Sequence, residues 1–274
     1  MSIRFANHTD IPKLRHIMKV VFGDLDSFLD RFFNYKFKNN ALVYEVDQSI
    51  VSVAFLLPAF LNFKSLTYIF GCATLPNYRG KGIMTALLDE AFQIVCQQNQ
   101  LGLSLVPASE ALSQYYKTLG FQNQFYHNIS HFHLTDLLPH KSPLFSLQTL
   151  TPAQYADLRD SSFSVPSHLV WDVTHFQLVQ EEYVIEKGNF FAIKNDEELL
   201  GIGFFYTHHF QTFIPELLTG LNPVVVAQLF FQYLETNSTT IYTPGDEHCY
   251  GLMKWNPKCL DLKPQSAYLA FALE

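Results

Sequence analysis

The chain has 274 residues, of which 48% are hydrophobic and 16% charged, so it has ample material for packed cores and is not expected to be disordered. Its formal net charge is −7 and no run of basic residues occurs, which argues against a nucleic-acid partner. The apolar runs are too short to span a membrane, and the length favours about two domains.

The first residues contain no apolar segment typical of a secretion signal, so we expect a cytoplasmic enzyme. The four cysteines show no C-x-x-C spacing and are expected to be reduced thiols. Two pairs of histidines, His131 with His133 and His208 with His209, have no carboxylate or cysteine nearby in the sequence. We therefore expect no metal site. Composition leaves the oligomeric state open.

Hydrophobic periodicity and turn residues predict the elements of the first half. A strand at residues 2–6 precedes a helix that begins at Asp10 as N-cap and continues to about residue 20. The next predicted elements are a helix at 27–37, strands at 41–46, 50–61 and 66–75, a helix from Met84, a strand at 101–106, a helix at 111–118 and a strand at 125–134.

The segment Tyr78-Arg79-Gly80-Lys81-Gly82-Ile83-Met84 lies between the strand that stops at Pro76 and the helix that follows. Free N–H groups at a helix start, together with the helix dipole, attract anions. Two glycines lack the Cβ atoms that would hold an anion away, while Arg79 and Lys81 add positive charge. This pattern predicts a binding loop for a phosphorylated ligand, with an ordinary surface loop as the alternative.

Two common nucleotide loops do not fit this segment. Gly82 follows Lys81 where the G-x-x-x-x-G-K-[S/T] pattern requires serine or threonine. Thr85 stands where the G-x-G-x-x-G pattern requires its third glycine. The sequence therefore favours neither a nucleoside triphosphatase nor a nicotinamide site.

Two motifs together resemble the GNAT superfamily of acetyl-CoA-dependent N-acetyltransferases. The cofactor loop of that family reads Arg/Gln-x-x-Gly-x-Gly/Ala, and residues 79–84 match it except that Met84 replaces a small residue. The second motif, Tyr115-Tyr116-Lys117-Thr118-Leu119-Gly120-Phe121, is similar to the aromatic-Tyr-x-x-x-Gly-Phe segment of the family. The resemblance implies a GNAT fold, an α/β fold with a mixed, largely antiparallel and splayed sheet flanked by helices.

The resemblance also implies the roles of individual residues. Acetyl-CoA would lie along the strand end and the glycine loop, and the cofactor-binding residues would be Ala73, Thr74, Leu75, Arg79, Gly80, Lys81, Gly82, Ile83, Met84 and Thr85. Tyr116 aligns with the general acid of the family. The alternative is that Tyr116 or its neighbour Tyr115 is an ordinary aromatic residue on the helix face. On the acceptor side we expect Asp24, Asp26 and Glu110. The general base stays open among these three, the C-terminal carboxylate at Glu274 and water.

The second half repeats the predicted order of elements in weaker form. We expect a helix at 153–159, strands at 190–194, 199–206 and 212–218, a helix at 223–234, a strand at 240–242 and a strand at 267–274. Thr219-Gly220-Leu221-Asn222 occupies the place of the cofactor loop but has no basic residue. We predict a GNAT domain at 1–137, a linker at 138–143 and a degenerate GNAT-like domain at 144–274. The pairing resembles the architecture of the enhanced-intracellular-survival acetyltransferases.

These features favour an N-acetyltransferase that moves an acetyl group to a primary amine of a small cationic molecule or a peptide. The alternative is a non-catalytic module that binds or senses acyl-CoA. Two features favour it: Met84 in the loop, and the absence of an acidic residue on the strand before Pro76. A third hypothesis is a structural protein that binds a partner through its second half.

Overall fold

The computed structural model describes residues 1–137, 145–161 and 167–273. The chain forms two compact units that interleave in sequence. Unit 1 takes the described residues of Met1–Phe125 and Tyr250–Gln265, and those from Ala272 onward; unit 2 takes the described residues of Tyr126–Cys249 and Ser266–Phe271. The linker predicted at 138–143 lies outside the described residues, and the predicted domain boundaries at 137 and 144 stay a prediction.

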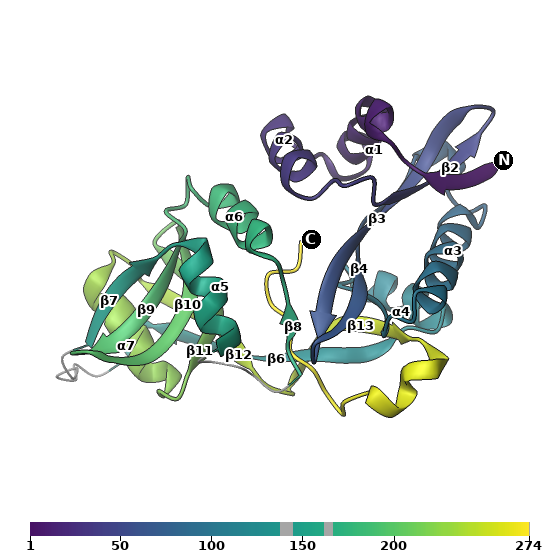
Figure 1. The fold of residues 1–274 in the computed structure, drawn as a ribbon. Helices are drawn as coiled ribbons and strands as arrows, with labels where there is room; N and C mark the ends of the chain where they lie inside the picture. The colour runs from purple at the N-terminus through teal and green to yellow at the C-terminus, as the bar shows by residue number, and fades with distance from the viewer. Residues whose placement is uncertain (138–144, 162–166, 274) are drawn as a thin grey trace. The chain divides into compact units, whose positions relative to one another are not determined.

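Unit 1 follows the predicted order of strands and helices (Figure 1). Its elements are β1 (Ser2–Phe5), α1 (Ile11–Phe22), α2 (Asp26–Tyr35), β2 (Ala41–Val46), β3 (Ser49–Leu61), β4 (Lys64–Thr74), α3 (Ile83–Gln97), β5 (Gly102–Leu105) and α4 (Glu110–Thr118). The strands are ordered β1-β2-β3-β4-β5-β13-β6, where β6 (Gln122–His133) and β13 (His248–Trp255) belong in part to each unit. Most pairs are antiparallel, whereas β4 and β5 run parallel.

Helices cover both faces of the sheet in unit 1. On one face, the ring of Phe32 from α2 lies 4.9 Å from Phe55 and 4.8 Å from Phe70 between ring centroids. On the other face, α3 buries an apolar stripe that includes Leu87 and Leu88. The spacing of this stripe is that of one helix face, so the sequence pattern alone explains why α3 packs there.

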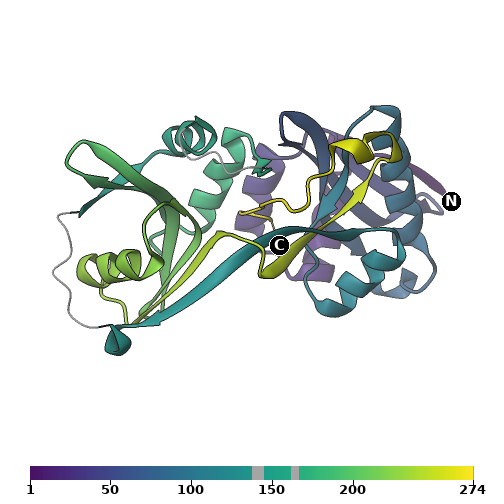
Figure 2. The same cartoon turned by 90° about the horizontal axis from the view of Figure 1, so that it is seen from below.

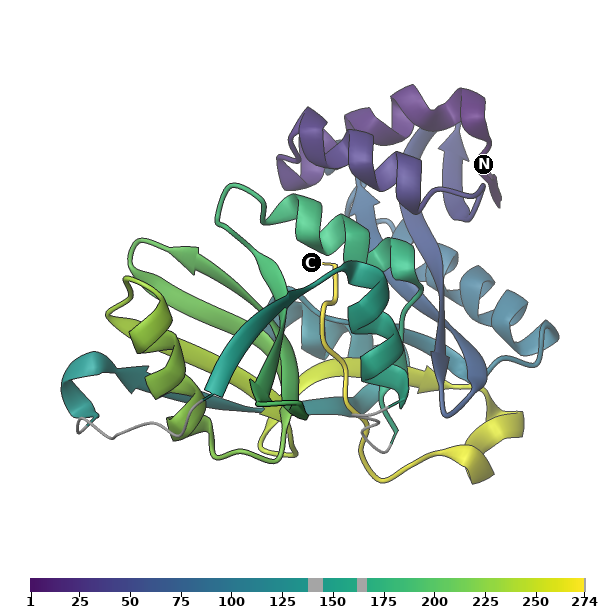
Figure 3. The same ribbon diagram turned by 60° about the vertical axis from the view of Figure 1, so that its left-hand side comes forward.

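The strands of unit 2 continue the same sheet order beyond β6 (Figure 2). The elements of this unit are β7 (Phe145–Leu150), α5 (Pro152–Ser161), the short β8 (Leu169–Val170), α6 (Val173–Glu182), β9 (Asn189–Asn195), β10 (Glu198–His208), β11 (Gln211–Thr219), α7 (Pro223–Tyr233) and β12 (Ser238–Pro244). The sheet is ordered β6-β12-β11-β10-β9-β7, with β11 and β12 parallel. Helices α7 and α5 lie on opposite faces of it (Figure 3).

The structure differs from the sequence predictions at both ends of the chain. Asp10 does occupy the N-cap position of α1, but its carboxylate does not cap the helix because it pairs with Arg4, with 2.7 Å between Nη1 and Oδ2. The strand predicted at 267–274 is wrong for the described residues 267–273, which form only isolated bridges, at Ala267 and Tyr268. Carbonyls of this segment accept hydrogen bonds from scattered donors, and Phe271 turns the backbone with φ of 55°.

Candidate active site

A β-bulge bends β4 just before the predicted cofactor residues. The register advances two residues on β3, from Val53 to Phe55, but three on β4, from Ala73 to Phe70. Gly71 lies in the bulge with φ of 61°, and a Cβ atom there would lie 3.0 Å from the side chain of Met18. Glycine suits both this conformation and the tight space beside Met18, and the bulge redirects the strand. The isolated glycine in a strand pattern was the available sequence signal for this feature.

Strands β4 and β5 part from one another within a few residues. Among the described residues their pairing is confined to Thr67 with Leu103 and Tyr68 with Ser104. Beyond Tyr68, β4 continues to Thr74 while it pairs with β3 alone. The N–H of Leu75 donates to the carbonyl of Val51 over 2.9 Å, so strand alternation directs the N–H of Thr74 away from β3. A backbone donor therefore faces the side where β5 no longer pairs.

The turn that follows β4 leads into a helix start that no side chain caps. Gly80 and Gly82 have φ of 72° and 73°, and a Cβ atom at either position would meet no protein atom within 4 Å. Gly82 is the N-cap of α3, and within the described residues no side chain accepts a capping hydrogen bond from the first N–H groups of the helix. The left-handed glycines thus present the positive end of the helix to an open space, as an anion site requires.

The two cations of the loop lie beside this helix start. Both Arg79 and Lys81 are exposed, and the Nε of Arg79 donates to the carbonyl oxygen of Thr74 over 3.0 Å, which ties the loop to the end of β4. The Nζ of Lys81 lies 5.1 Å from the centroid of the Tyr78 ring. Met84 is half-buried and packs against the core cluster of unit 1, whereas the buried Ile83 begins the apolar stripe of α3.

The two tyrosines of the second motif have different partners. The hydroxyl of Tyr115 lies 3.0 Å from Oγ1 of Thr85, in the first turn of α3. Tyr116 is 7% exposed and belongs to the core cluster against which Cys72 of β4 also packs. The fold therefore brings Tyr115 to the glycine loop and Tyr116 to β4, although the two residues are adjacent in sequence.

Cys72 and Tyr116 interact through their side chains. Burial, followed by the effect of Cys72, raises the pKa of the Tyr116 phenol well above its usual value. Burial likewise raises the pKa of the Cys72 thiol to about 12. The phenol is protonated at neutral pH, and its raised pKa makes it a weaker acid than an exposed tyrosine; the thiol is uncharged.

The predicted acceptor-side carboxylates are more scattered. Asp24 is half-buried in the turn between α1 and α2. Asp26 is exposed and forms ion pairs of 2.6 Å with Arg15 and with Lys19; first Lys19 and then Arg15 lower its pKa. Glu110 is the exposed first residue of α4 and accepts a hydrogen bond from Gln114 over 2.6 Å.

The remaining candidate base, Glu274, lies outside the described residues. Its neighbour Leu273 is described, and the carbonyl of Leu273 accepts a hydrogen bond from the hydroxyl of Tyr68 over 3.0 Å. Tyr68 is the last residue of β4 that pairs with β5. Among the described candidates Asp24, Asp26 and Glu110, no burial or contact given above selects one as the base.

Unit 2 has the corresponding strand, turn and helix, but its helix start is already occupied. The side chain of Asn222 accepts a hydrogen bond from the N–H of Val224 over 2.9 Å, and Pro223 brings no N–H at all. On β11, Glu216 is buried and bound by Arg159, with 2.8 Å between Nε and Oε2, and by the hydroxyl of Tyr155. These contacts give a physical reason why the second copy is degenerate.

Neither a metal cluster nor a membrane-spanning helix occurs in the described part of the chain. No three metal-ligating side chains converge among the residues described. The helices of the described ranges are all too short or too polar to cross a bilayer. Histidines of both sequence pairs have other contacts: Nδ1 of His131 lies 3.0 Å from Oγ1 of Thr240, and the ring of His208 packs on that of His209.

Comparison with known proteins identifies the N-terminal fold. Residues 2–123 match the family model of the acetyltransferase (GNAT) domain. This range contains the bulged strand, the glycine loop and both tyrosines. Residues 2–123 are therefore similar to a GNAT acetyltransferase domain. Among curated proteins, none matches the chain significantly.

Solved structures extend the likeness to both units. A GCN5-related N-acetyltransferase from Anabaena variabilis ATCC 29413 is similar with a TM-score of 0.75 at 15% identity, over 94% of this chain and 73% of that one. Eis1 from Mycobacterium abscessus gives 0.72 at 11% identity, over 94% and 74%. A tandem GNAT protein from the clavulanic acid biosynthesis pathway gives 0.54 at 11% identity, over 92% and 97%. The fold is thus that of a tandem GNAT protein, with a GNAT domain followed by a degenerate GNAT-like one.

Proposed function

We propose that this protein is an acetyl-CoA-dependent N-acetyltransferase that acetylates a primary amine of a small cationic molecule or a peptide. The GNAT domain supports acyl transfer, and the acceptor class follows from the resemblance together with the acidic residues near the turn between α1 and α2. The amine attacks directly while both substrates are bound, since the chain offers a thiol at Cys72 that stays uncharged and is a poor nucleophile.

One observation carries this proposal: the start of α3 is reached through two left-handed glycines and has no side-chain cap. The corresponding helix start in unit 2 is capped by Asn222. A helix start without a cap leaves N–H donors for the diphosphate of coenzyme A, and Arg79 and Lys81 add charge beside it. The residues present therefore fit the cofactor in unit 1.

The chemistry needs a polarised carbonyl and a proton for the leaving thiolate. Acetyl-CoA, when bound, supplies a thioester that an amine can attack. The N–H of Thr74, directed away from β3, would donate to the oxygen that becomes negative, a contact that contributes about 3 kcal/mol in comparable sites. Tyr116 would hold a proton near neutral pH and give it to the sulfur as negative charge develops there.

The incoming amine must lose a proton, and the structure supports water more than Asp26 in that role. Asp26 already neutralises Arg15 and Lys19, and those cations lower its pKa, so it is a weak base. Glu110 and Asp24 stay candidates.

A non-catalytic acyl-CoA sensor is the second candidate. It is favoured by β4, which carries no acidic residue on any of its positions Lys64–Thr74. Such a protein would bind the same cofactor through the same loop but would have no acceptor.

An assay of coenzyme A release from acetyl-CoA with a panel of primary amines tests the proposed function. We expect turnover with at least one amine and a large loss of kcat on Tyr116→Phe. Tight binding of acetyl-CoA without turnover on any amine would favour the sensor. Absence of binding would contradict both.

A further inference from the structure

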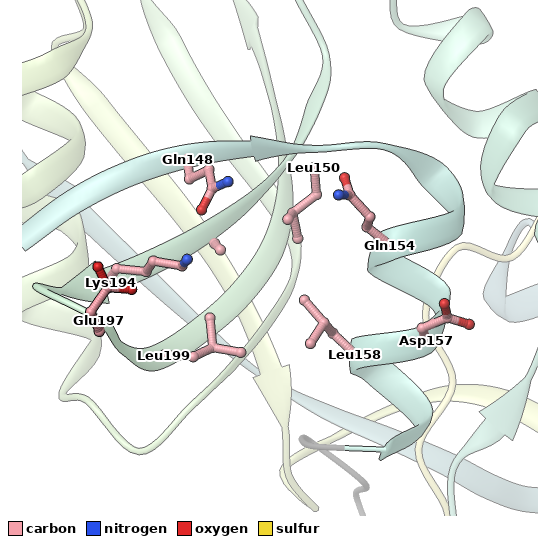
Figure 4. Close-up of a pocket in the computed structure, with 9 residues that line it drawn as sticks. Gln148, Leu150, Gln154, Asp157, Leu158, Lys194, Glu197 and Leu199 are labelled. Carbon is pink, nitrogen blue, oxygen red and sulfur yellow. The ribbon is translucent and has the colours of Figure 1, made fainter.

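Unit 2 contains a pocket that the proposed reaction does not use. It has a volume of about 390 Å³ and lies between α5 and the face of the sheet formed by β7, β9 and β10 (Figure 4). Helix α5 directs Tyr155 and Arg159 into the buried cluster around Glu216. The neighbouring stripe of α5, which carries Leu158, overhangs the sheet where β9 has the small residue Ala192. The short side chain of Ala192 leaves this space open.

The lining combines an apolar centre with charged residues on two sides. Leu150, Leu158 and Leu199 form the apolar part, and Figure 4 shows them between the two polar sides of the pocket. On one side, Lys194 at the end of β9 directs its ammonium group inward, and Glu197 of the following turn lies next to it. Asp157 of α5 lies on the other side, where Figure 4 shows its carboxylate directed away from the leucines. Within the described chain, neither Lys194 nor Glu197 has an ion-pair partner.

This arrangement fits one class of small molecule. Ligand sites usually enclose roughly 300–1,000 Å³, so a pocket of this volume suits a small ligand. A simple anion would meet the negative charge of Glu197, and a simple cation would meet Lys194. A zwitterion whose opposite charges are adjacent can pair with both residues at once, and a short aliphatic tail can then cover the leucines.

We propose that this pocket binds a free aliphatic α-amino acid. Lys194 holds the carboxylate, Glu197 holds the ammonium group, and Leu150, Leu158 and Leu199 contact the side chain. The degenerate unit would thus have exchanged the cofactor site of its parent fold for a ligand site on the opposite face of its sheet from α7. The proposal is independent of acetyl transfer.

The test uses L-leucine as the probe and follows the amide NMR signals of the full chain. We expect leucine to shift the signals of residues 148–158 and 192–199 in a saturable way. Two analogues lack one charge each: 4-methylpentanoate lacks the ammonium group, and 3-methylbutylamine lacks the carboxylate. Each should bind at least about tenfold more weakly, because one charge-assisted contact is lost.

A matched pair of neighbouring variants makes the test specific. Glu197→Gln should weaken leucine about tenfold, because the contact to its ammonium group is lost, and should strengthen 4-methylpentanoate, because the carboxylate that repels this anion is removed. Glu198→Gln alters the next residue, which is exposed and does not line the pocket, and should change neither ligand. Unmoved signals at saturating leucine, equal binding of leucine and both analogues, or equal effects of the two variants would each overturn the proposal.

Discussion

The Oγ1 atom of Thr85 lies 3.0 Å from the hydroxyl oxygen of Tyr115, so one hydrogen bond joins the first turn of α3 to α4. Tyr116, the next residue, instead reaches the core beside Cys72 of β4. The two tyrosines therefore connect the glycine loop to the strand on which the acetyl group is expected, and substitutions at them should affect different kinetic constants.

Tyr116→Phe should lower kcat about 100-fold and change KM little, because the phenol proton is needed only as the thiolate leaves. Steady-state kinetics with a saturating amine measures this effect. Tyr115→Phe is the matched control: it removes the hydrogen bond to Thr85 and should raise KM for acetyl-CoA roughly fivefold, with kcat near that of the unmodified protein. Equal losses of kcat in both variants would contradict the separate roles.

Gly82→Val should raise KM for acetyl-CoA sharply, since the new side chain occupies the space in front of the helix start. Because Gly82 has φ of 73°, valine would also cost about 1–2 kcal/mol of stability. Gly23→Val is the control, since Gly23 has φ of 78° and an equally open surrounding at the end of α1. It should show a similar loss of stability with an unchanged KM for acetyl-CoA; a similar rise of that KM in both variants would count against the loop.

Glu216→Gln should lower the free energy of unfolding by about 3 kcal/mol, because the buried guanidinium of Arg159 would lose its counter-charge. Urea denaturation followed by circular dichroism measures the change. Glu198→Gln, at an exposed position of β10, is the control and should leave the urea midpoint equal to that of the unmodified protein within experimental error. If both variants are equally stable, the buried pair does not hold unit 2 together.

The stability should also fall as the pH is lowered from neutral. Burial, and then the nearby His248, lowers the pKa of His127 to about 4 from a usual value of 6.5. The unfolded chain thus binds more protons than the folded one between these two values, so stability is complete above 6.5 and is lost toward 4. His127→Gln should reduce the fall in the urea midpoint between pH 7 and 5, whereas His16→Gln, at an exposed site, should not.

Much of the fold could be predicted because its signals are local. The stripe that includes Leu87 and Leu88 and the stop at Pro76 set α3 and β4, and both lie within two residues of their predicted places. The bulge at Gly71 was missed although a local signal existed, since an isolated glycine in a strand pattern suggests a bulge. Strand β13 was missed for a different reason: its residues become a strand by pairing with β5, far away in sequence.

The candidate site shows the same division. The glycine loop could be found from its composition, whereas the choice between Tyr115 and Tyr116 required the packing of α4. The self-capping of α7 by Asn222 could have been read from the Asn-Pro dipeptide that precedes the helix, since asparagine is a favoured N-cap and proline a favoured first residue. The ion pair of Arg159 with Glu216 could not be predicted from the sequence, since the two residues are 57 positions apart.

The central claim is that the start of α3 binds the diphosphate of coenzyme A, and an NMR titration with coenzyme A tests it most directly. The account predicts that the amide signals of residues 79–85 move in a saturable way, while those of the Asn222-capped start of α7 stay in place. Unmoved signals at 79–85, or equal movement at both helix starts, would contradict it.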